Sequence, residues 1–288
     1  MLTKVRIFWR RFRHTCWRKI VPLTVQMSLA LPRHNIKKSG PLKLVIDNSA
    51  IAKGVTHGTA WVSTGPKTWG DFEFDSGYSA RIPIHSPQNA SEEYREITYL
   101  TGIAELARSG HLKLFTSNEL HVEAVRHPPG MMRGYESSDL NIFSGIEIPW
   151  VEEKLTALFE TAEEQSARLL RNAVEPFQTL RKFIDHPKDV LDVWHIHTAH
   201  HAGASYFLTM DGALCRKFRQ ARKRRGFPTL NAEPILPSEL GKSIGLRELP
   251  TFLFSYQEEE RTFFIRHDLH LPGEKRRGRF SYRKKRQK

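Results

Sequence analysis

Short apolar runs alternate with amphipathic segments along most of the chain. The runs Leu42–Ile46 and Leu112–Phe115 have the length of buried strands. Two further strands are predicted at Ser205–Thr209 and immediately before Leu236. From Ser91 to Gly110, apolar residues recur at helical spacing. Strands that alternate with helices are typical of α/β proteins, so we expect a central parallel sheet covered by helices.

The remaining helices are predicted from the same spacing. The longest of them should run from about Pro149 to Ala173. Its apolar face would comprise Val151, Leu155, Leu158, Phe159, Ala162 and Leu169. Shorter helices are expected at Asn118–Arg126, Phe177–Ile184, Asp189–Ala202, Gly212–Arg225 and after Pro237.

Residues 54–90 break this alternation. They contain eight Gly or Pro residues and short aromatic pieces such as Asp71–Phe74 and Tyr78–Ile84. We therefore expect loops and a hairpin here, outside the central sheet. The predicted organisation is a basic extension over residues 1–40, an α/β domain over residues 41–245 with insertions at about 54–90 and 140–185, and a C-terminal extension over residues 246–288 that ends in a basic tail.

The charge of the chain is unevenly distributed. The 288 residues carry a net +14, yet residues 1–46 hold eleven Lys or Arg and no acid. Residues 274–288 hold nine Lys or Arg and one Glu, which leaves a net charge of −5 for residues 47–273. A mildly acidic body between two basic arms indicates a polyanionic partner, most commonly nucleic acid.

The composition excludes several other classes of protein. With 39% hydrophobic and 26% charged residues, the chain is typical of globular proteins rather than disordered or fibrous ones. The longest apolar run, residues 20–31, is too short to span a bilayer and contains Pro22, so we expect no integral membrane association. Cys16 and Cys215 lie far apart and indicate neither a disulfide framework nor a zinc finger. A reducing, cytoplasmic location fits best.

The N-terminal stretch has three interpretations. Residues 9–19 interleave Lys and Arg with Trp and Phe, a pattern shared by transit peptides and membrane-surface helices. Alternatively, Met27 is the true start and the preceding residues are an extension. The sequence leaves these interpretations open.

Acidic residues follow the predicted strands. Asp47 and Asp211 come directly after strands, Glu119 and Glu123 lie on the helix after the second strand, and Asp192 lies near the start of a later helix. In parallel sheets, ligands bind at the carboxyl ends of the strands. Two unit charges about 4 Å apart repel by roughly 4 kcal/mol at an effective dielectric constant of about 20, so this grouping needs a cation or shifted pKa values. Oxygen ligands without Cys favour Mg²⁺ or Mn²⁺.

Four segments occur in the order seen in PIN domains, a family of metal-dependent ribonucleases that the sequence resembles. They read LKLVIDNSAI, LFTSNELHVEAV, DVWHIHTAHHAGASYFLTMDGAL and ILPSEL. The third is the most specific, and the residues that keep the family's spacing in it are Asp192, Ala199, Gly203, Thr209 and Asp211. The resemblance covers about residues 41–244 and implies a PIN-like three-layer α/β/α sandwich with a central parallel sheet.

The resemblance also implies an activity, that of an endoribonuclease that hydrolyses the phosphodiester bonds of RNA. Asp47, Glu123, Asp192 and Asp211 would then hold one or two Mg²⁺ or Mn²⁺ ions, and water would attack the phosphorus in line. RNA is the implied substrate, and an antitoxin or another protein is a further implied partner. The long insertions and the basic arms argue against a small toxin of the usual type.

Two hydroxyls and a basic helix accompany the acids. Ser49 and Thr209, each two residues from an Asp, would orient carboxylates or water, and ordinary turn and strand-end hydrogen bonding is the alternative. The helix after Asp211 would offer a track for phosphates, with a solvated helix face as the alternative. Its basic residues are Arg216, Lys217, Arg219, Arg222, Lys223, Arg224 and Arg225.

Two other acids compete for places in the site. Glu119 competes with Glu123, which is favoured because it lies one helical turn further in. Asp189 competes with Asp192, which is favoured by its spacing to Asp211. Taken singly, each acid could instead be a helix cap or a solvated loop residue.

The same residues bear on three other functions. A haloacid-dehalogenase-like phosphatase would need a second Asp where Ser49 stands. His197 and His201, four residues apart, could bind zinc or another transition metal. His195 lies one turn after Asp192 and is expected to be packed or solvent-facing, with a contact to RNA as the alternative. The non-enzymatic alternative is a catalytically weak PIN-like module that binds RNA or a protein, and metal binding would distinguish it from an enzyme.

Overall fold

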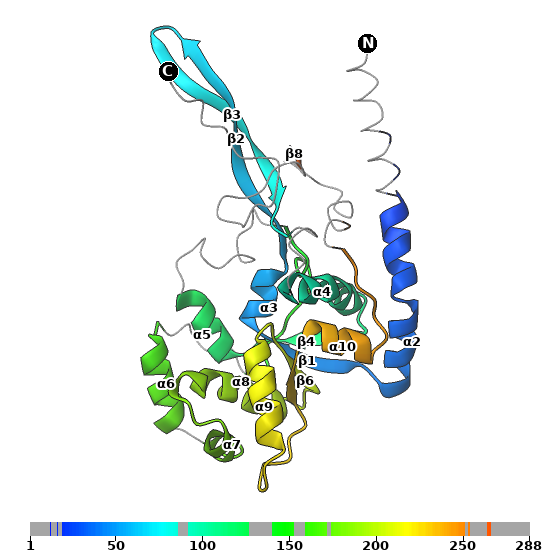
Figure 1. Ribbon diagram of the computed structural model, residues 1–288, viewed down its shortest axis with the longest axis vertical. Coiled ribbons are helices and arrows are strands. Elements are labelled where there is room, and N and C mark those ends of the chain that lie inside the picture. Colours follow the sequence, from blue (N-terminus) through cyan, green and yellow to red (C-terminus); the bar gives the residue numbers. More distant parts are fainter. Residues whose placement is uncertain are drawn as a thin grey trace.

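A parallel β-sheet forms the centre of the computed structural model, which describes residues 19–85, 92–126, 140–152, 159–171 and 174–250, together with residues 12, 16, 253, 264 and 265. Its strands lie in the order β4-β1-β6-β7, and each pairs with its neighbour in parallel. They are β1 (Leu42–Ile46), β4 (Leu112–Phe115), β6 (Tyr206–Leu208) and β7 (Glu233–Ile235). The expected α/β fold with a central parallel sheet is therefore confirmed (Figure 1).

Alternate residues of the strands face two separate hydrophobic cores. In β1, Leu44 and Ile46 belong to one core and Val45 to the other. Successive side chains of a strand point to opposite faces, so helices must cover both faces of the sheet. The first core is shared with α2 (Ala30–Ser39), α3 (Asn48–Lys53), α4 (Glu92–Arg108) and α10 (Pro237–Ser243). The second is shared with α5 (Asn118–Arg126), α7 (Phe177–Phe183), α8 (Val190–His201) and α9 (Gly212–Arg222). The result is three layers.

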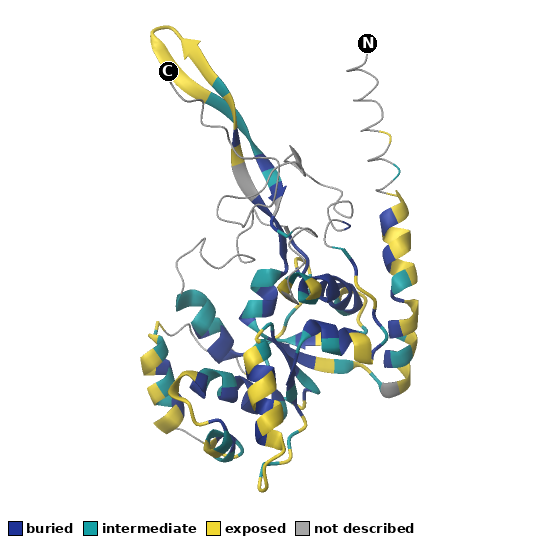
Figure 2. Ribbon diagram, viewed as in Figure 1, coloured by how far each residue is buried: buried dark blue, intermediate teal, exposed yellow. Residues whose placement is uncertain are grey.

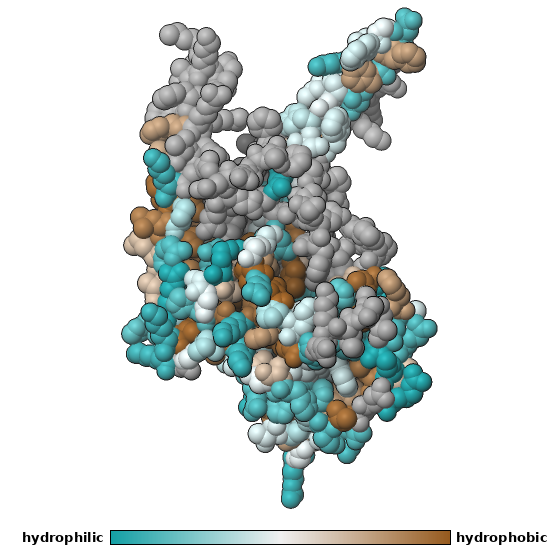
Figure 3. Space-filling model, turned by 180° about the vertical axis from the view of Figure 1, so that it is seen from behind, coloured by the Kyte–Doolittle hydropathy of each residue, from teal (hydrophilic) through white to brown (hydrophobic). Residues whose placement is uncertain are grey.

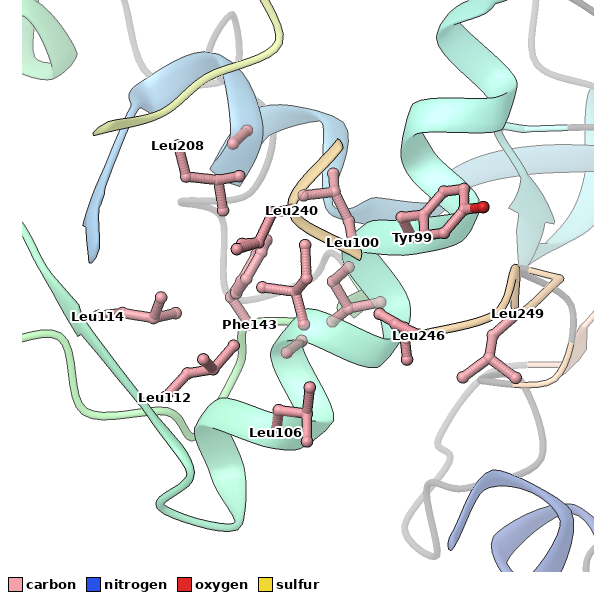
Figure 4. Close-up of a cluster of buried hydrophobic side chains, with 14 of the residues drawn as sticks. Tyr99, Leu100, Leu106, Leu112, Leu114, Phe143, Leu208, Leu240, Leu246 and Leu249 are labelled. Carbon is pink, nitrogen blue, oxygen red and sulfur yellow. The ribbon is translucent and has the colours of Figure 1, made fainter. Parts of the chain in front are cut away.

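Leucine is the commonest residue of the first core. Figure 4 shows Leu106 of α4 close to Leu112 and Leu114 of β4, with Leu240 of α10 nearby. Burying a leucine side chain stabilises a fold by about 1.5–3 kcal/mol. This core therefore fixes the orientation of α4 and α10 against the sheet.

The N-terminal basic stretch also contributes to the first core. Residues 19–28 are helical and precede α2. Val21, Val25, Leu29 and Ile36 recur along one face and are at most 2% exposed. The helices thus pack against the domain through an apolar stripe. Among the described residues, no helix is long and apolar enough to cross a membrane.

Residues 55–83 form a two-stranded ribbon, here named the arm, which projects from the domain (Figure 1). Its strands β2 (Val55–Trp69) and β3 (Phe72–Pro83) pair antiparallel along most of their length. At the base of the arm, β5 (Leu140–Asn141) and β8 (Phe264–Ile265) complete a second sheet in the order β5-β2-β3-β8.

The prediction of a hairpin outside the central sheet is confirmed, but its strands are much longer than the short aromatic pieces from which it was predicted. Glycines and prolines had suggested loops. Five of the eight, Gly58, Gly65, Pro66, Gly77 and Pro83, lie within the strands of the ribbon, where a register shift between Ser63 and Gly65 accommodates the Gly65–Pro66 pair. Pro87 lies outside the described residues.

The predicted long helix from Pro149 to Ala173 is wrong in its first half. Helix α6 covers only Ala162–Arg171. Residues 149–151 instead extend beside the end of β4, where the amide nitrogens of Thr116 and Val151 donate to the carbonyls of Pro149 and Thr116. Phe159, placed on the buried face by the prediction, is 88% exposed. The apolar spacing could not reveal that a strand end would capture this backbone, and residues 153–158 and 172–173 lie outside the described residues.

Candidate functional site

The carboxyl ends of β1 and β6 meet where the chain changes direction across the sheet. From β1 the chain continues to β4 on one side, and from β6 it continues to β7 on the other. This reversal separates the connecting segments and leaves a crevice in open α/β sheets, in which ligands bind. Asp47 follows β1 and Asp211 follows β6, so both stand at this position.

Two hydroxyl groups hold the carboxylate of Asp47. Ser49 Oγ and Thr209 Oγ1 both donate to Asp47 Oδ2, at 2.5 and 2.6 Å. The Met210 amide in turn donates to Ser49 Oγ at 3.1 Å, which fixes that hydroxyl. Asp47 occupies the cap position of α3, yet its side chain makes no capping hydrogen bond. Its second oxygen, Oδ1, accepts no hydrogen bond from the described residues.

Asp211 combines a structural role with a position in the same crevice. Its Oδ1 accepts hydrogen bonds from the amides of Ala213 and Leu214 at 2.7 and 3.0 Å, so it caps α9. The helix-cap interpretation therefore holds for one oxygen of Asp211. The other oxygen, Oδ2, accepts no hydrogen bond from the described residues.

Glu123 reaches the site from α5 and pairs with a histidine that the sequence analysis did not place there. His195 Nε2 lies 2.9 Å from Glu123 Oε1, and His195 is only 2% exposed. Burial alone would lower the pKa of His195, but Glu123, with Asp47 and Asp192, raises the pKa to about 9. Burial likewise opposes ionisation of Glu123, yet the charge and hydrogen bond of His195 bring its pKa below the usual value. The pair is therefore ionic at neutral pH.

Asp192 joins the other carboxylates through its electrostatics. The pKa of Asp192 is raised to about 6. Burial is the largest cause, the charges of Asp47, Asp211 and Glu123 add to the rise, and the charge of His195 opposes it. Its side chain accepts no hydrogen bond from the described residues. Three carboxylates from other segments thus act electrostatically on Asp192, and we name the four together the carboxylate cluster (Asp47, Glu123, Asp192 and Asp211).

The two competing acids lie in ion pairs outside this cluster. Glu119, 7% exposed, pairs with Arg168 and accepts a hydrogen bond from Gln165 at 2.7 Å. Asp189, in the 3₁₀ turn Pro187–Asp189, pairs with Lys217 at 2.7 Å. Each of these acids already has a cationic partner from the chain.

The basic residues of α9 and of the turn after it differ in their partners. Lys217 pairs with Asp189, Arg219 with Glu239 and Arg222 with Glu233. Arg224 lies over the ring of Phe183 at 5.1 Å. The remaining three, Arg216, Lys223 and Arg225, form no ion pair with the described residues. The basic C-terminal tail lies outside the described residues.

The other histidines of α8 form a separate group. The rings of His197 and His201 lie 4.4 Å apart, and His197 also contacts Trp194 and Phe177. Burial, together with His201 and His200, lowers the pKa of His197 to about 4. His197 is therefore a neutral side chain packed among aromatic rings.

Neither the grouping of possible metal ligands nor the comparison with known proteins identifies the site. Within the described ranges, no three His, Cys, Asp or Glu side chains are grouped closely enough to hold a metal ion between them. Comparison of the chain with protein-family models, with curated proteins and with solved structures finds no match. The geometry and electrostatics of the carboxylate cluster are therefore the observations that bear on function.

Proposed function

We propose that the chain is a PIN-like ribonuclease whose carboxylate cluster binds Mg²⁺ or Mn²⁺. The observation that carries this proposal is the raised pKa of Asp192, which reflects burial together with the charges of three other carboxylates, of which only Glu123 is paired with His195. Ionised groups held together against their own repulsion are typical of functional sites. The position of the cluster at the carboxyl edge of a parallel sheet supports the same conclusion.

The donor set fits such an ion. Mg²⁺ retains several of its water molecules and needs only one or two protein carboxylates, with substrate phosphates completing its shell. Asp47 and Asp211 each have one oxygen held by the chain and one that takes no hydrogen bond from the described residues. A bound divalent ion would supply neutralisation of phosphate charge and activation of water for in-line attack.

The residues around the cluster would prepare it for an anionic substrate. Ser49 and Thr209 fix the orientation of Asp47, so that little reorganisation is needed when a ligand binds. His195 keeps Glu123 ionised and offsets one negative charge. Arg216 lies one turn along α9 from Gly212, within the helix that Asp211 caps, and is available for a phosphate contact.

Neutralising single carboxylates tests the proposal. We expect Asp47→Asn and Asp211→Asn each to reduce Mg²⁺- or Mn²⁺-dependent cleavage of single-stranded RNA by about 10²-fold or more, because each removes an electrostatic catalytic group. Asp185→Asn is the matched control, since Asp185 is an exposed acid outside the cluster, and it should retain full activity. Circular dichroism would verify that all three variants fold.

Metal binding separates this function from the non-enzymatic alternative. Calorimetric titration should show Mg²⁺ or Mn²⁺ binding to the wild-type chain and weaker binding to both site variants. Wild-type protein that binds RNA but shows neither metal binding nor cleavage would contradict the proposal and support an RNA-binding module instead.

A further inference from the structure

The arm has two chemically different faces. Cross-strand partners in an antiparallel ribbon share a face, and faces alternate along each strand. The register pairs Trp69 with Phe72 and Lys67 with Phe74, and Tyr78 and Val62 follow on the same face. Lys67 is the one charged side chain at these positions. We name this surface the aromatic face.

The opposite face of the arm is polar and acidic. It carries the pairs Thr68–Glu73 and Pro66–Asp75, and Ser63 donates to Asp75 at 2.5 Å. Trp61 also lies on this face, where its ring covers Gly77 so closely that an added Cβ would be 2.7 Å from it. The ring of Trp61 therefore packs against Gly77 of the arm.

The aromatic face is covered near the domain and bare at the far end. Towards the base, Val62, Ala80 and Ile82 are at most 8% exposed. At the far end, Trp69 and Phe72 are both 80% exposed and Phe74 is 44% exposed. Figure 2 shows this gradient along the arm, and Figure 3 shows hydrophobic residues exposed among hydrophilic ones at its end. An isolated two-stranded ribbon is marginally stable in water, so an exposed aromatic face on it indicates a missing contact.

We propose that the aromatic face is a self-association surface, on which a second copy of this chain packs its own aromatic face. Three aromatic side chains at these exposures offer about 450 Å² per copy, since a large aromatic residue buries roughly 150–250 Å². Two copies would thus bury about 900 Å² from these residues alone, which is below the roughly 1,200 Å² at the lower end of stable specific interfaces, so we expect a weak dimer. A two-fold arrangement brings the same patch from both copies together and closes the assembly.

Charge argues against two other occupants. The end of the arm, residues 66–75, contains Asp71, Glu73 and Asp75 but only one basic residue, Lys67. Single-stranded nucleic acid needs a positively charged surface as well as aromatic rings. A bilayer would have to accommodate Asp71 in the turn between Trp69 and Phe72, which is costly. Face-to-face packing of two copies leaves Glu73 and Asp75 on the outer, solvated sides.

Sedimentation equilibrium of the full chain over about 1–100 μM tests this surface, because small interfaces associate in that range. The wild-type chain should dimerise. Trp69→Ser combined with Phe72→Ser should raise the dimer dissociation constant at least 100-fold, because two central aromatic anchors are lost. Trp61→Ser is the matched control, an exposed tryptophan of the same strand on the other face, and it should change the constant less than about threefold.

The alternatives give distinct outcomes. If the double variant fails to fold, residues 66–75 can be replaced by Asn-Gly between the paired residues Gly65 and Ser76, which shortens the arm with a turn that suits a hairpin. That variant should be monomeric. A wild-type chain that stays monomeric overturns the proposal, as does a double variant that dimerises like wild type. Arm-dependent binding to single-stranded RNA or to neutral phospholipid vesicles by a monomeric chain would assign the face to that ligand instead.

Discussion

Two groups of buried or partly buried acids on α5 and around the start of α8 have different partners. Glu119 and Asp189 lie at the outer positions, where Arg168 and Lys217 neutralise them. Glu123 and Asp192, one helical turn further along, face Asp47 and Asp211 and receive only the charge of His195 as an ion-pair partner from the described residues. The difference separates acids that have their own cationic partner in the chain from acids that would bind a metal ion under the proposed function.

Substitutions that remove charge from the two groups should therefore change the free energy of unfolding in opposite directions. A buried acid with a cationic partner is costly to separate from it, because an unpaired charge remains. A buried acid among other acids is costly to keep ionised, and the pKa of Asp192 near 6 measures that cost. Removing the cationic partner of an acid in the first group should therefore destabilise the folded chain, and neutralising an acid of the second group should stabilise it.

The largest effect is expected at Arg168, which bonds to both Glu119 and Glu160. Arg168→Met should lower the free energy of unfolding by about 3–5 kcal/mol, since it leaves two largely buried carboxylates without their cation. Urea denaturation would measure the change. Arg171→Met is a suitable control, because Arg171 is exposed on the same helix, and a loss of similar size there would contradict the assignment.

Much of this contrast could be predicted from the sequence, and some could not. The bounds of α5, the four central strands and the position of Asp47 and Asp211 after strands follow from short-range patterns. The choice of Glu123 over Glu119 used helix geometry, and the structure places their side chains in different surroundings. Whether the cluster binds metal remains a prediction.

The role of His195 was missed because a single histidine in an apolar helix has no distinctive pattern. It lies three residues after Asp192, hence on the same side of α8, and that spacing was the available signal. Similarly, the length of the arm depends on pairing between distant residues such as His57 and Pro83, which apolar periodicity does not encode.

A medium effect of opposite sign is expected at Asp192. Its folded-state pKa of about 6 exceeds the ordinary value of 3.8, so the free energy of unfolding falls as the pH rises from about 4 to about 6. Asp192→Asn removes this titration. In the presence of a chelator, the variant should be more stable than wild type by about 3 kcal/mol at pH 7.5 and nearly equal to it near pH 4.

Thermal unfolding at both pH values would measure this difference. A variant that is less stable than wild type at pH 7.5 would show that the Asp192 carboxylate contributes to the fold rather than straining it. Asp189→Asn provides the comparison, because it removes a paired carboxylate from the start of the same helix and should not stabilise the chain.

The smallest effect is expected at Lys217, although its ion pair resembles that of Arg168 in geometry. Lys217 is 48% exposed, so water screens its charge, and Asp189 keeps a favourable position at the amino end of α8 when the lysine is removed. Lys217→Met should therefore lower the free energy of unfolding by less than about 1 kcal/mol, and raising the salt concentration should shrink the difference further. Urea denaturation at low and high salt would measure both quantities. A loss as large as that of Arg168→Met would mean that the two ion pairs are equally buried in solution. The exposure of the basic partner would then not explain why one ion pair contributes more to stability than the other.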